Sequence, residues 1–355
     1  MHDNETLDKP APPARFSNES PRADAPKAEK QGFASLSFLG KFVLLLLSVV
    51  LASCPGTDPP PPIKTPEPPP NPLAVADDLL SKGKPIEAIH KLNEVSWTVP
   101  EGMAARRLIS DICTRIELNG PDRPRIDLVE VIGTLPHDPT CFTEGLEVDG
   151  DTLLESCGLN GESRIRRVNM QTGAVVNERQ LGGTYFGEGV TRFGDATFVL
   201  TWIDGTGFVF DSKLTQELRR FPIRGQGWGL THDATHLIYS NGTHELGFLD
   251  PNTGAVQKSL QVFNGDLPLM NMNELEYVDG ELLAVIFPTE RIARIDPKSG
   301  KVIGWILAEG LLSNALRYKA DVLNGIAYDP VGKRYFLAGK LWPTTFIVRF
   351  VPLPR

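Results

Sequence analysis

Short runs of alternating apolar and polar residues dominate the chain from Arg125 onward. Residues 164–168 and 197–200 are two examples, and turns rich in Gly, Asp and Asn bound each run. Alternation with a period of two is typical of β-strands, because successive side chains point to opposite faces of a sheet. The pattern therefore predicts an all-β domain over residues 125–355.

One turn motif, built around an Asn or Asp, repeats through this domain. The repeated positions are separated by 42, 39, 46 and 33 residues, and they are Asn169, Asp211, Asp250, Asp296 and Asp329. Four-stranded propeller blades typically span ~40–45 residues. The spacing predicts a five-bladed β-propeller, with a β-sandwich and a propeller of six irregular blades as the alternatives.

A different pattern, with apolar residues at helical spacing, covers residues 73–124. It is formed by Leu79, Leu80, Ile86, Ala88, Ile89, Leu92 and Val95, followed by Leu108, Ile109, Ile112 and Ile116. This spacing predicts a short α-helical segment similar to one tetratricopeptide-type hairpin. A single unit of that kind cannot bury its own apolar face, so we expect it to pack on the larger domain or on a partner.

The N-terminal residues 1–54 are predicted to be a disordered lipoprotein anchor segment. The apolar run 42–54 is too short for a membrane-spanning helix, which needs ~20 residues, but it suits the core of a signal peptide. Its end, Leu51–Cys54, resembles a bacterial lipobox, which predicts lipidation of Cys54. An ordinary signal peptide or a short buried helix is the alternative.

Residues 55–72 are rich in proline, which predicts an extended linker without a core. Together with the lipobox, this linker predicts a head held at the bacterial cell envelope by a lipid anchor. The periplasmic and outer-membrane faces both remain open.

Charge and cysteine content narrow the classes of function. A net charge of −8 and a pI near 5.4 argue against nucleic-acid binding. Lipidation of Cys54 would leave three cysteines, so at least one thiol is free. Cys141 and Cys157 flank a predicted turn at Asp149-Gly150, and either a disulfide or two unpaired buried cysteines would fit there. The histidines of the domain lack zinc-site spacing, so no metal ligands are predicted.

The candidate for catalysis is Glu188, which lies between two glycines in Phe186–Gly189. Glycine lets the backbone turn tightly and lets a substrate approach closely. Similar segments recur at one phase of the strand pattern, and in a propeller they would converge on one mouth of the channel. They are Phe142–Gly145, Gln226–Gly229, Asn273–Glu276, Leu323–Gly325 and Gly339–Pro343. A plain turn at Glu188, with tryptophans that only pack between blades, is the alternative.

Residues 130–350 resemble the plant and bacterial glutaminyl cyclase (glutamine cyclotransferase) family of five-bladed propellers. The matching segments occur in family order and are His137–Leu146, Glu155–Leu159, Tyr185–Gly189, Leu200–Trp202, Gly227–Thr231, Asn273–Glu276, Arg291–Asp296, Leu323–Ala327 and Gly339–Pro343. The resemblance implies that Glu188 is the proton-transferring carboxylate. It also implies substrate-binding residues, with an aromatic pocket and two polar contacts, namely Phe142, Trp202, Trp228, Asn273 and Lys340.

Two further residues are predicted to bind substrate, although each differs from the residue that the family usually has. Glu144 stands where the family usually has Gln, and Phe287 stands where it usually has Trp. Glu144 adds an acid that could alter either substrate preference or the protonation of Glu188. Phe287 keeps an apolar wall but lacks an indole N–H donor.

The resemblance implies a glutaminyl-peptide cyclotransferase of the acyltransferase class, which converts N-terminal glutamine to pyroglutamate and releases ammonia. We expect no cofactor for catalysis and no catalytic metal, with structural calcium in the channel as an open expectation. The expected partners are peptides or proteins with N-terminal Gln and, through the lipid, a membrane; we expect a monomer. The alternative is a lipid-anchored propeller that binds peptides or partner proteins without catalysis.

Overall fold

The computed structural model describes residues 70–96, 99–117 and 123–354. The predicted anchor segment 1–54, the lipidation of Cys54 and most of the linker therefore lie outside the described residues. Within those ranges, no helix combines the length and the apolar character needed to cross a membrane. The described part is mostly β-sheet, with a few short helices.

Three helices precede the sheets, and they are α1 (Pro72–Ser81), α2 (Pro85–Asn93) and α3 (Glu101–Cys113). The side chain of Asn71 caps α1 by accepting the backbone N–H of Leu73 at 2.9 Å. Both α1 and α2 begin with proline, which suits a first turn because the missing N–H has no helical partner there. The helices form where the helical spacing predicts them, and the first begins at Pro72.

The strands then follow in chain order, with one short helix, α4 (Asn314–Arg317), between β19 and β20. They are β1 (Arg125–Pro136), β2 (Thr143–Asp149), β3 (Thr152–Cys157), β4 (Arg164–Asn169), β5 (Val175–Gln180), β6 (Gly187–Phe193), β7 (Ala196–Thr201), β8 (Thr206–Asp211), β9 (Glu217–Pro222), β10 (Leu230–His232), β11 (Leu237–Tyr239), β12 (Glu245–Leu249), β13 (Val256–Gln261), β14 (Phe263–Asn264), β15 (Leu267–Pro268), β16 (Met272–Val278), β17 (Glu281–Ile286), β18 (Arg291–Ile295), β19 (Val302–Leu307), β20 (Leu323–Asp329), β21 (Arg334–Gly339) and β22 (Thr344–Pro352).

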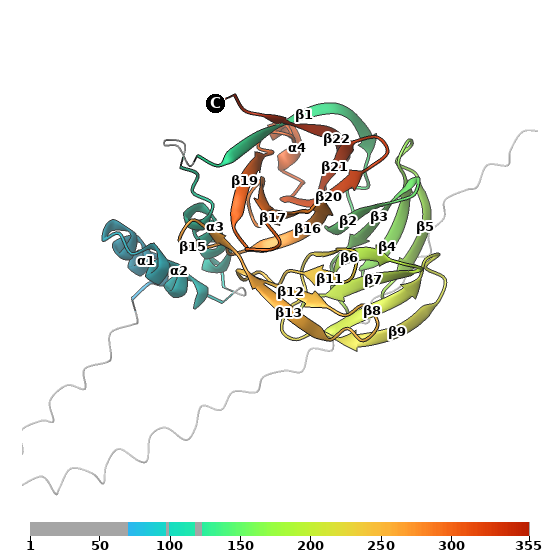
Figure 1. Ribbon diagram of the computed structural model, residues 1–355, viewed down its shortest axis with the longest axis horizontal. Helices are drawn as coiled ribbons and strands as arrows, with labels where there is room; N and C mark the ends of the chain where they lie inside the picture. The colour runs from blue at the N-terminus through green and yellow to red at the C-terminus, as the bar shows by residue number, and fades with distance from the viewer. Residues whose placement is uncertain (1–69, 97–98, 118–122, 355) are drawn as a thin grey trace, which may run out of the picture. The chain divides into compact units, whose positions relative to one another are not determined.

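Most strands belong to antiparallel sheets built from chain neighbours. Three sheets have four strands each (β2–β5, β6–β9 and β10–β13), and β14 pairs with β15. One eight-stranded sheet has the order β16-β17-β18-β19-β1-β22-β21-β20. The first strands contact one another in a closed order, β2 with β6, β6 with β10, β10 with β16, β16 with β20 and β20 with β2, and they lie at the centre of the ring (Figure 1).

In the four-stranded sheets the first three strands are mostly buried, and the fourth strand is the exposed one. β3 is buried at every position, whereas the outer strands β5 and β13 are mostly exposed. Strands buried on both faces lose the simple alternation that a half-exposed strand shows. Burial alternates on the outer strand β9, whereas the runs 164–168 and 197–200 lie on the mostly buried strands β4 and β7.

The repeated turn motif joins the third and fourth strands in four cases. Asp250 shows how it works: its Oδ1 accepts the backbone N–H groups of Asn252 (2.7 Å) and Thr253 (3.1 Å). Asp329, the fifth position, lies instead between β20 and β21, the first and second strands of their half-sheet. The equivalent turn cannot exist there, because the outer strand next to β22 is β1, from the start of the domain.

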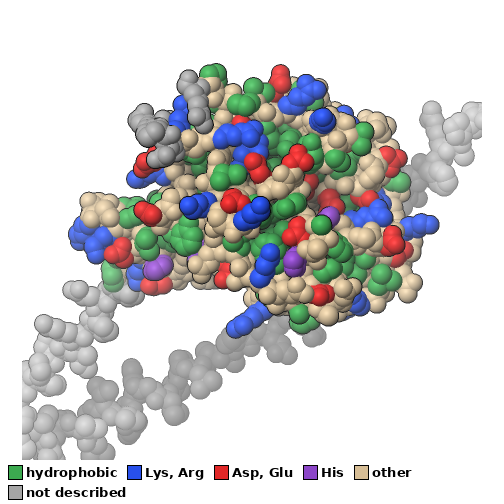
Figure 2. All heavy atoms as spheres, in the orientation of Figure 1, with side chains coloured by type: hydrophobic (Ala, Val, Ile, Leu, Met, Phe, Trp, Pro, Cys, Tyr) green, Lys and Arg blue, Asp and Glu red, His purple; other side chains and the backbone are tan. Residues whose placement is uncertain are grey.

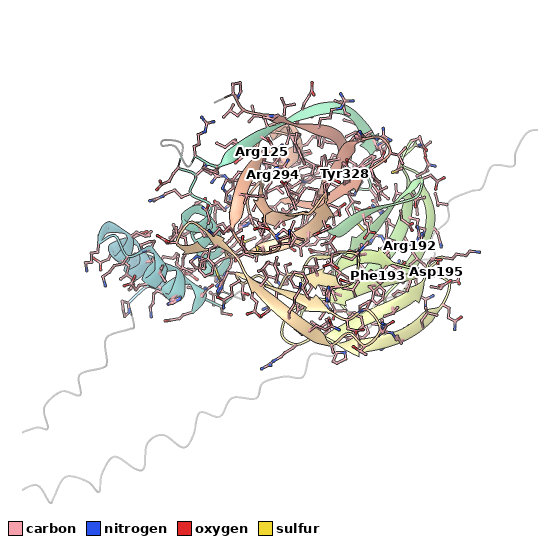
Figure 3. The ribbon with its side chains drawn as sticks, viewed as in Figure 1. Arg125, Arg192, Phe193, Asp195, Arg294 and Tyr328 are labelled. Atoms are coloured by element: carbon pink, nitrogen blue, oxygen red, sulfur yellow. A yellow bond between two sulfur atoms is a disulfide. The ribbon has the colours of Figure 1, made fainter. Side chains whose placement is uncertain are left out.

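β1 closes the ring by pairing parallel to β19 and antiparallel to β22. Its Asp127 is fully buried and accepts hydrogen bonds from Arg294 Nε (2.9 Å) and Arg125 Nε (2.9 Å). Both arginines lie at this junction (Figure 3). The bond from Arg294 ties β1 to β18, whereas the bond from Arg125 lies within β1.

The helical segment packs on the sheets and shares one apolar core with them. Ile89 and Leu92 of α2 and Ile109 of α3 lie in the same cluster as Phe248 and Trp305. This packing agrees with the expectation that the segment docks on the larger domain.

Over the face drawn in Figure 2, acidic and basic side chains are interspersed.

Candidate active site

All the predicted pocket residues converge on one cavity of about 250 Å³. It is lined by the predicted residues Phe142, Glu144, Glu188, Trp202, Trp228, Asn273, Phe287 and Lys340. Three further lining residues, Met103, Phe186 and Asp321, were not predicted to bind substrate. Phe186 was noted only as a neighbour of Glu188.

The positions of these residues on the strands explain why they meet. Glu144, Glu188 and Asn273 lie at the beginnings of the central strands β2, β6 and β16. Trp202 and Lys340 directly follow β7 and β21, the second strands of their sheets. Because adjacent strands are antiparallel, the start of a first strand and the end of a second strand share one edge. The pocket is therefore at one end of the ring.

Gly189, which follows Glu188, and Gly229 serve the ring of central strands rather than a substrate. A Cβ on Gly189 would lie 2.4 Å from the backbone nitrogen of Leu230, and one on Gly229 would lie 2.1 Å from the carbonyl oxygen of Asn273. These contacts are too close for any side chain. The glycine pattern thus points to the correct place, but the reason is the close approach of neighbouring strands.

Aromatic rings form most of the cavity wall. Phe186 packs edge-on against Phe142, with ring centroids 6.2 Å apart, and against Trp202 at 5.6 Å. Trp228 and Phe287 make a similar contact at 6.0 Å. Such edge-to-face contacts fix ring orientation as well as burying apolar area.

Gln226, which sequence reasoning did not select, orients the two tryptophans. Its Oε1 accepts hydrogen bonds from Trp202 Nε1 (2.7 Å) and Trp228 Nε1 (2.8 Å). One amide oxygen therefore fixes two walls of the cavity. The only sequence signal was its place in the Gln226–Gly229 segment.

Glu144 is held in a buried ion pair with Lys340. Its other oxygen accepts a hydrogen bond from Asn324 Nδ2 at 2.8 Å. Lys340 Nζ also lies 4.4 Å from the ring centroid of Phe142. Burial raises the pKa of Glu144, while the charge of Lys340 opposes that rise. With both oxygens satisfied and a cation attached, Glu144 is the acid of the pocket that carries the charge.

Glu188 is the second buried acid, with 5% of its surface exposed. Burial and then the negative charge of Glu144 hold its pKa well above the usual range, although Lys340 acts in the opposite direction. Among the described residues, Glu188 Oε2 and Asn273 Oδ1 have no hydrogen-bond partner. The pocket thus presents two polar atoms whose hydrogen-bonding capacity a ligand can satisfy.

Two other acids from the same segments lie outside the pocket. Glu274 accepts the backbone N–H groups of Leu146 (3.1 Å) and Ile326 (3.0 Å), and Glu276 accepts that of Tyr328 (3.0 Å). Burial raises the pKa of both carboxyl groups well above the usual range. They connect neighbouring central strands, so their role is structural.

Cys141 and Cys157 form a disulfide, with Cα atoms 5.0 Å apart, and Cys113 is free and buried. Of the two arrangements that the sequence left open, the structure has the bonded one. His137, Cys141 and Glu155 lie close together, but a sulfur in a disulfide is no metal ligand. His137 Nε2 instead contacts Glu155 Oε1, on β3, at 2.7 Å.

Comparisons with known proteins point to one family. A family model described as glutamine cyclotransferase matches residues 106–350. A glutaminyl-peptide cyclotransferase of Arabidopsis thaliana is 41% identical over 232 residues, which cover 63% of this chain and 72% of the relative. The crystal structure of the Myxococcus xanthus glutaminyl cyclase is similar with a TM-score of 0.61 and 32% identity, covering 65% of this chain and all of that one.

Proposed function

The chain belongs to the glutamine cyclotransferase family, and we propose that it is a glutaminyl-peptide cyclotransferase in which Glu188 moves the proton. It acts on peptides or proteins with N-terminal glutamine and belongs to the acyltransferase class. The observation that carries the proposal is the unpartnered Glu188 carboxyl oxygen in an aromatic pocket beside the Glu144–Lys340 pair. A propeller that binds peptides without catalysis is not favoured, since the family and both relatives are named for the cyclisation.

The reaction closes a ring within one residue. The neutral α-amine of the substrate attacks the carbon of its own side-chain carboxamide, so a C–N bond forms and the C–N bond to the leaving nitrogen breaks. The aromatic walls hold the folded conformer in which these two groups meet and keep water out. The protein's remaining task is to move one proton.

Glu188 performs that transfer. It takes a proton from the attacking amine and delivers it to the leaving nitrogen, so ammonia departs and Glu188 returns to its first state. Its raised pKa suits both proton transfers. The carboxylate is a stronger base than usual toward the amine, and the protonated acid is still available near neutral pH for the leaving nitrogen. Glu144 contributes by keeping a negative charge next to Glu188.

Asn273 and Lys340 supply the polar contacts. The carboxamide of Asn273 offers both a donor and an acceptor to the substrate, and its Oδ1 has no partner among the described residues. Charge that develops on the reacting carbonyl oxygen is stabilised by donors already in place. Lys340 holds Glu144 and adds positive potential on the same side.

The test uses a Gln-initiated peptide and follows ammonia release together with the matching mass loss. Glu188→Gln should reduce kcat by about 10²–10⁴, the usual effect of removing a proton-transfer group. Glu276→Gln is the matched control, because it makes the same change at a buried acid outside the pocket. Undiminished turnover in Glu188→Gln, or none in the wild-type chain, would contradict the proposal.

The chain organisation proposed with this function is a five-bladed propeller over residues 125–355, preceded by the helical segment 73–124. Two features support five blades. The first strands contact one another in a closed order of five, and the eight-stranded sheet can be divided between β19 and β1 into two groups of four strands. We propose that the N-terminal segment 1–54 is a lipoprotein anchor lipidated at Cys54. The monomeric head would then lie at the cell envelope.

We propose catalysis without a metal, because Glu188 and the polar contacts account for every bond made and broken. Structural calcium in the channel stays a prediction. The buried channel acids Glu274 and Glu276 accept backbone N–H groups, so we assign no calcium ligands among them.

A further inference from the structure

The pocket has an open side, and that side is built by a helix. Glu188, Asn273 and Lys340 are no more than 5% exposed, whereas Met103 of α3 is 42% exposed. Asp321, the other exposed lining residue, precedes β20. Since the buried residues form the floor, a peptide whose terminal glutamine fills the pocket leaves it past Met103 and Asp321.

A second cavity continues from that opening. It has a volume of about 460 Å³ and shares Asp321 with the pocket. Arg107 and Asp111 of α3 line it. Met103, Arg107 and Asp111 are four residues apart in turn, so they lie on one face of the helix. One exposed face of α3 therefore borders both cavities.

α3 is fixed in this position by hydrogen bonds to the segments that carry pocket residues. Ser110 Oγ donates to the carbonyl oxygen of Phe287 at 2.6 Å. Asn271 Nδ2 donates to the carbonyl oxygen of Arg106 (3.0 Å) and to Ser110 Oγ (2.8 Å). The buried side of the same helix contributes Ile109 to the shared core. The helix is therefore a rigid wall.

The lining of the two cavities differs in chemistry. Met103 presents an apolar, flexible side chain that adapts to apolar groups of different shape. The second cavity holds paired charges instead, such as Arg291 with Glu309 (3.0 Å) and Arg317 with Glu290. Because these charges are already paired, this lining suits a polar, uncharged peptide backbone better than it suits a charged ligand.

We infer that α3 forms the subsites for the residues that follow the N-terminal glutamine. Met103 contacts an apolar second residue, and the peptide backbone then continues along the face that carries Arg107 and Asp111. The substrates favoured are thus peptides or proteins that begin with Gln followed by an apolar residue. This inference rests on the proposed function. Met103 also precedes residue 106, where the family match begins, so this part of the wall lies outside the matched region.

The experiment compares kcat/KM for Gln-Leu-Ala, Gln-Gly-Ala and Gln-Glu-Ala peptides with the full chain. The wild type should favour Leu over Gly at the second position, and Met103→Ala should reduce that ratio about fivefold, since part of a buried apolar contact is lost. Met103→Lys should raise the relative rate with Glu. Ile86→Ala is the matched control, because Ile86 is 41% exposed on α2 and does not line the pocket.

Ratios that stay at the wild-type values in both Met103 variants would overturn the inference, even if all three peptides are cyclised. Calorimetric binding of the same peptides separates this result from failure of the proposed function. A binding preference for Leu that depends on Met103, without ammonia release, would support the subsite and contradict the catalysis. Equal binding of the three peptides by all variants would overturn the subsite.

Discussion

At the residue scale, the protonation of the pocket depends on how two polar neighbours are divided between its two acids. Glu144 takes both Lys340 and Asn324. Glu188 has neither, and Glu144 lies beside it. Two nearby carboxyl groups cannot both ionise easily in a buried site. Glu144 therefore keeps the charge, and Glu188 keeps a proton to a higher pH than a carboxyl group in water.

This sharing predicts the pH dependence of Glu144→Gln. The carboxylate of Glu188 is the base, so kcat should fall as the pH drops through its raised pKa, well above the ordinary value of 4.5. Removing the charge of Glu144 lowers that pKa and frees Lys340 to lower it further. The acid limb should therefore move to lower pH.

The pH profile of kcat for the two enzymes with one peptide is the measurement. Ionisation of the substrate amine contributes equally to both profiles, so any difference comes from the pocket. Coincident acid limbs, or a limb that moves to higher pH, would contradict the role of Glu144.

Family motifs in the sequence predict most of the residues that line the pocket, but not the residues that hold them. Glu188 and Trp228 are found from motifs at or just before the first strands β6 and β10. Gln226 and Asn324 each make a side-chain hydrogen bond across a long stretch of sequence, Gln226 with Trp202 over 24 residues and Asn324 with Glu144 over 180 residues. A local sequence motif does not identify a hydrogen-bond partner that lies far away in the sequence.

At the element scale, two elements distant in sequence complete structures that the repeats begin. β1 fills the outer position beside β22, and α3 forms the open side of the pocket. The turn spacing predicts five repeats, yet it could not show that Asp329 belongs to a different turn. It also could not place Met103, since an exposed methionine on a helix carries no signal of its own.

Closure by β1 predicts a large effect of Asp127→Asn on stability. The substitution would leave Arg294, a buried guanidinium, with one charged partner fewer. Breaking a buried ion pair from one side typically costs about 3–5 kcal/mol of the free energy of unfolding. Urea denaturation of the full chain measures it. Asp195→Asn is the control, because Asp195 is fully exposed and should change stability little. Equal stabilities of the two variants would contradict the closure role.

At the scale of the whole molecule, buried acids stabilise the sheets, and the contributions of Glu155 and Glu276 respond to pH in opposite directions. The charges of His137 and Arg166 overcome burial and lower the pKa of Glu155 to about 2. Its contribution to stability is complete above pH 4.5 and is lost as the pH falls toward 2. Burial raises the pKa of Glu276, so its contribution is complete below pH 4.5 and is lost as the pH rises through the raised value.

The raised pKa of Glu276 predicts how the stability of Glu276→Gln changes with pH. Glu276→Gln keeps an oxygen that can accept the N–H of Tyr328 but cannot ionise, so it avoids the cost of burying a charge near Glu147. The free energy of unfolding of the variant, relative to wild type, should therefore rise by about 1 kcal/mol or more between pH 5 and pH 8, since each pKa unit is worth ~1.4 kcal/mol. Denaturation at both pH values gives the difference. A difference that is constant with pH, or that falls, would mean that Glu276 is charged in the folded ring at little cost.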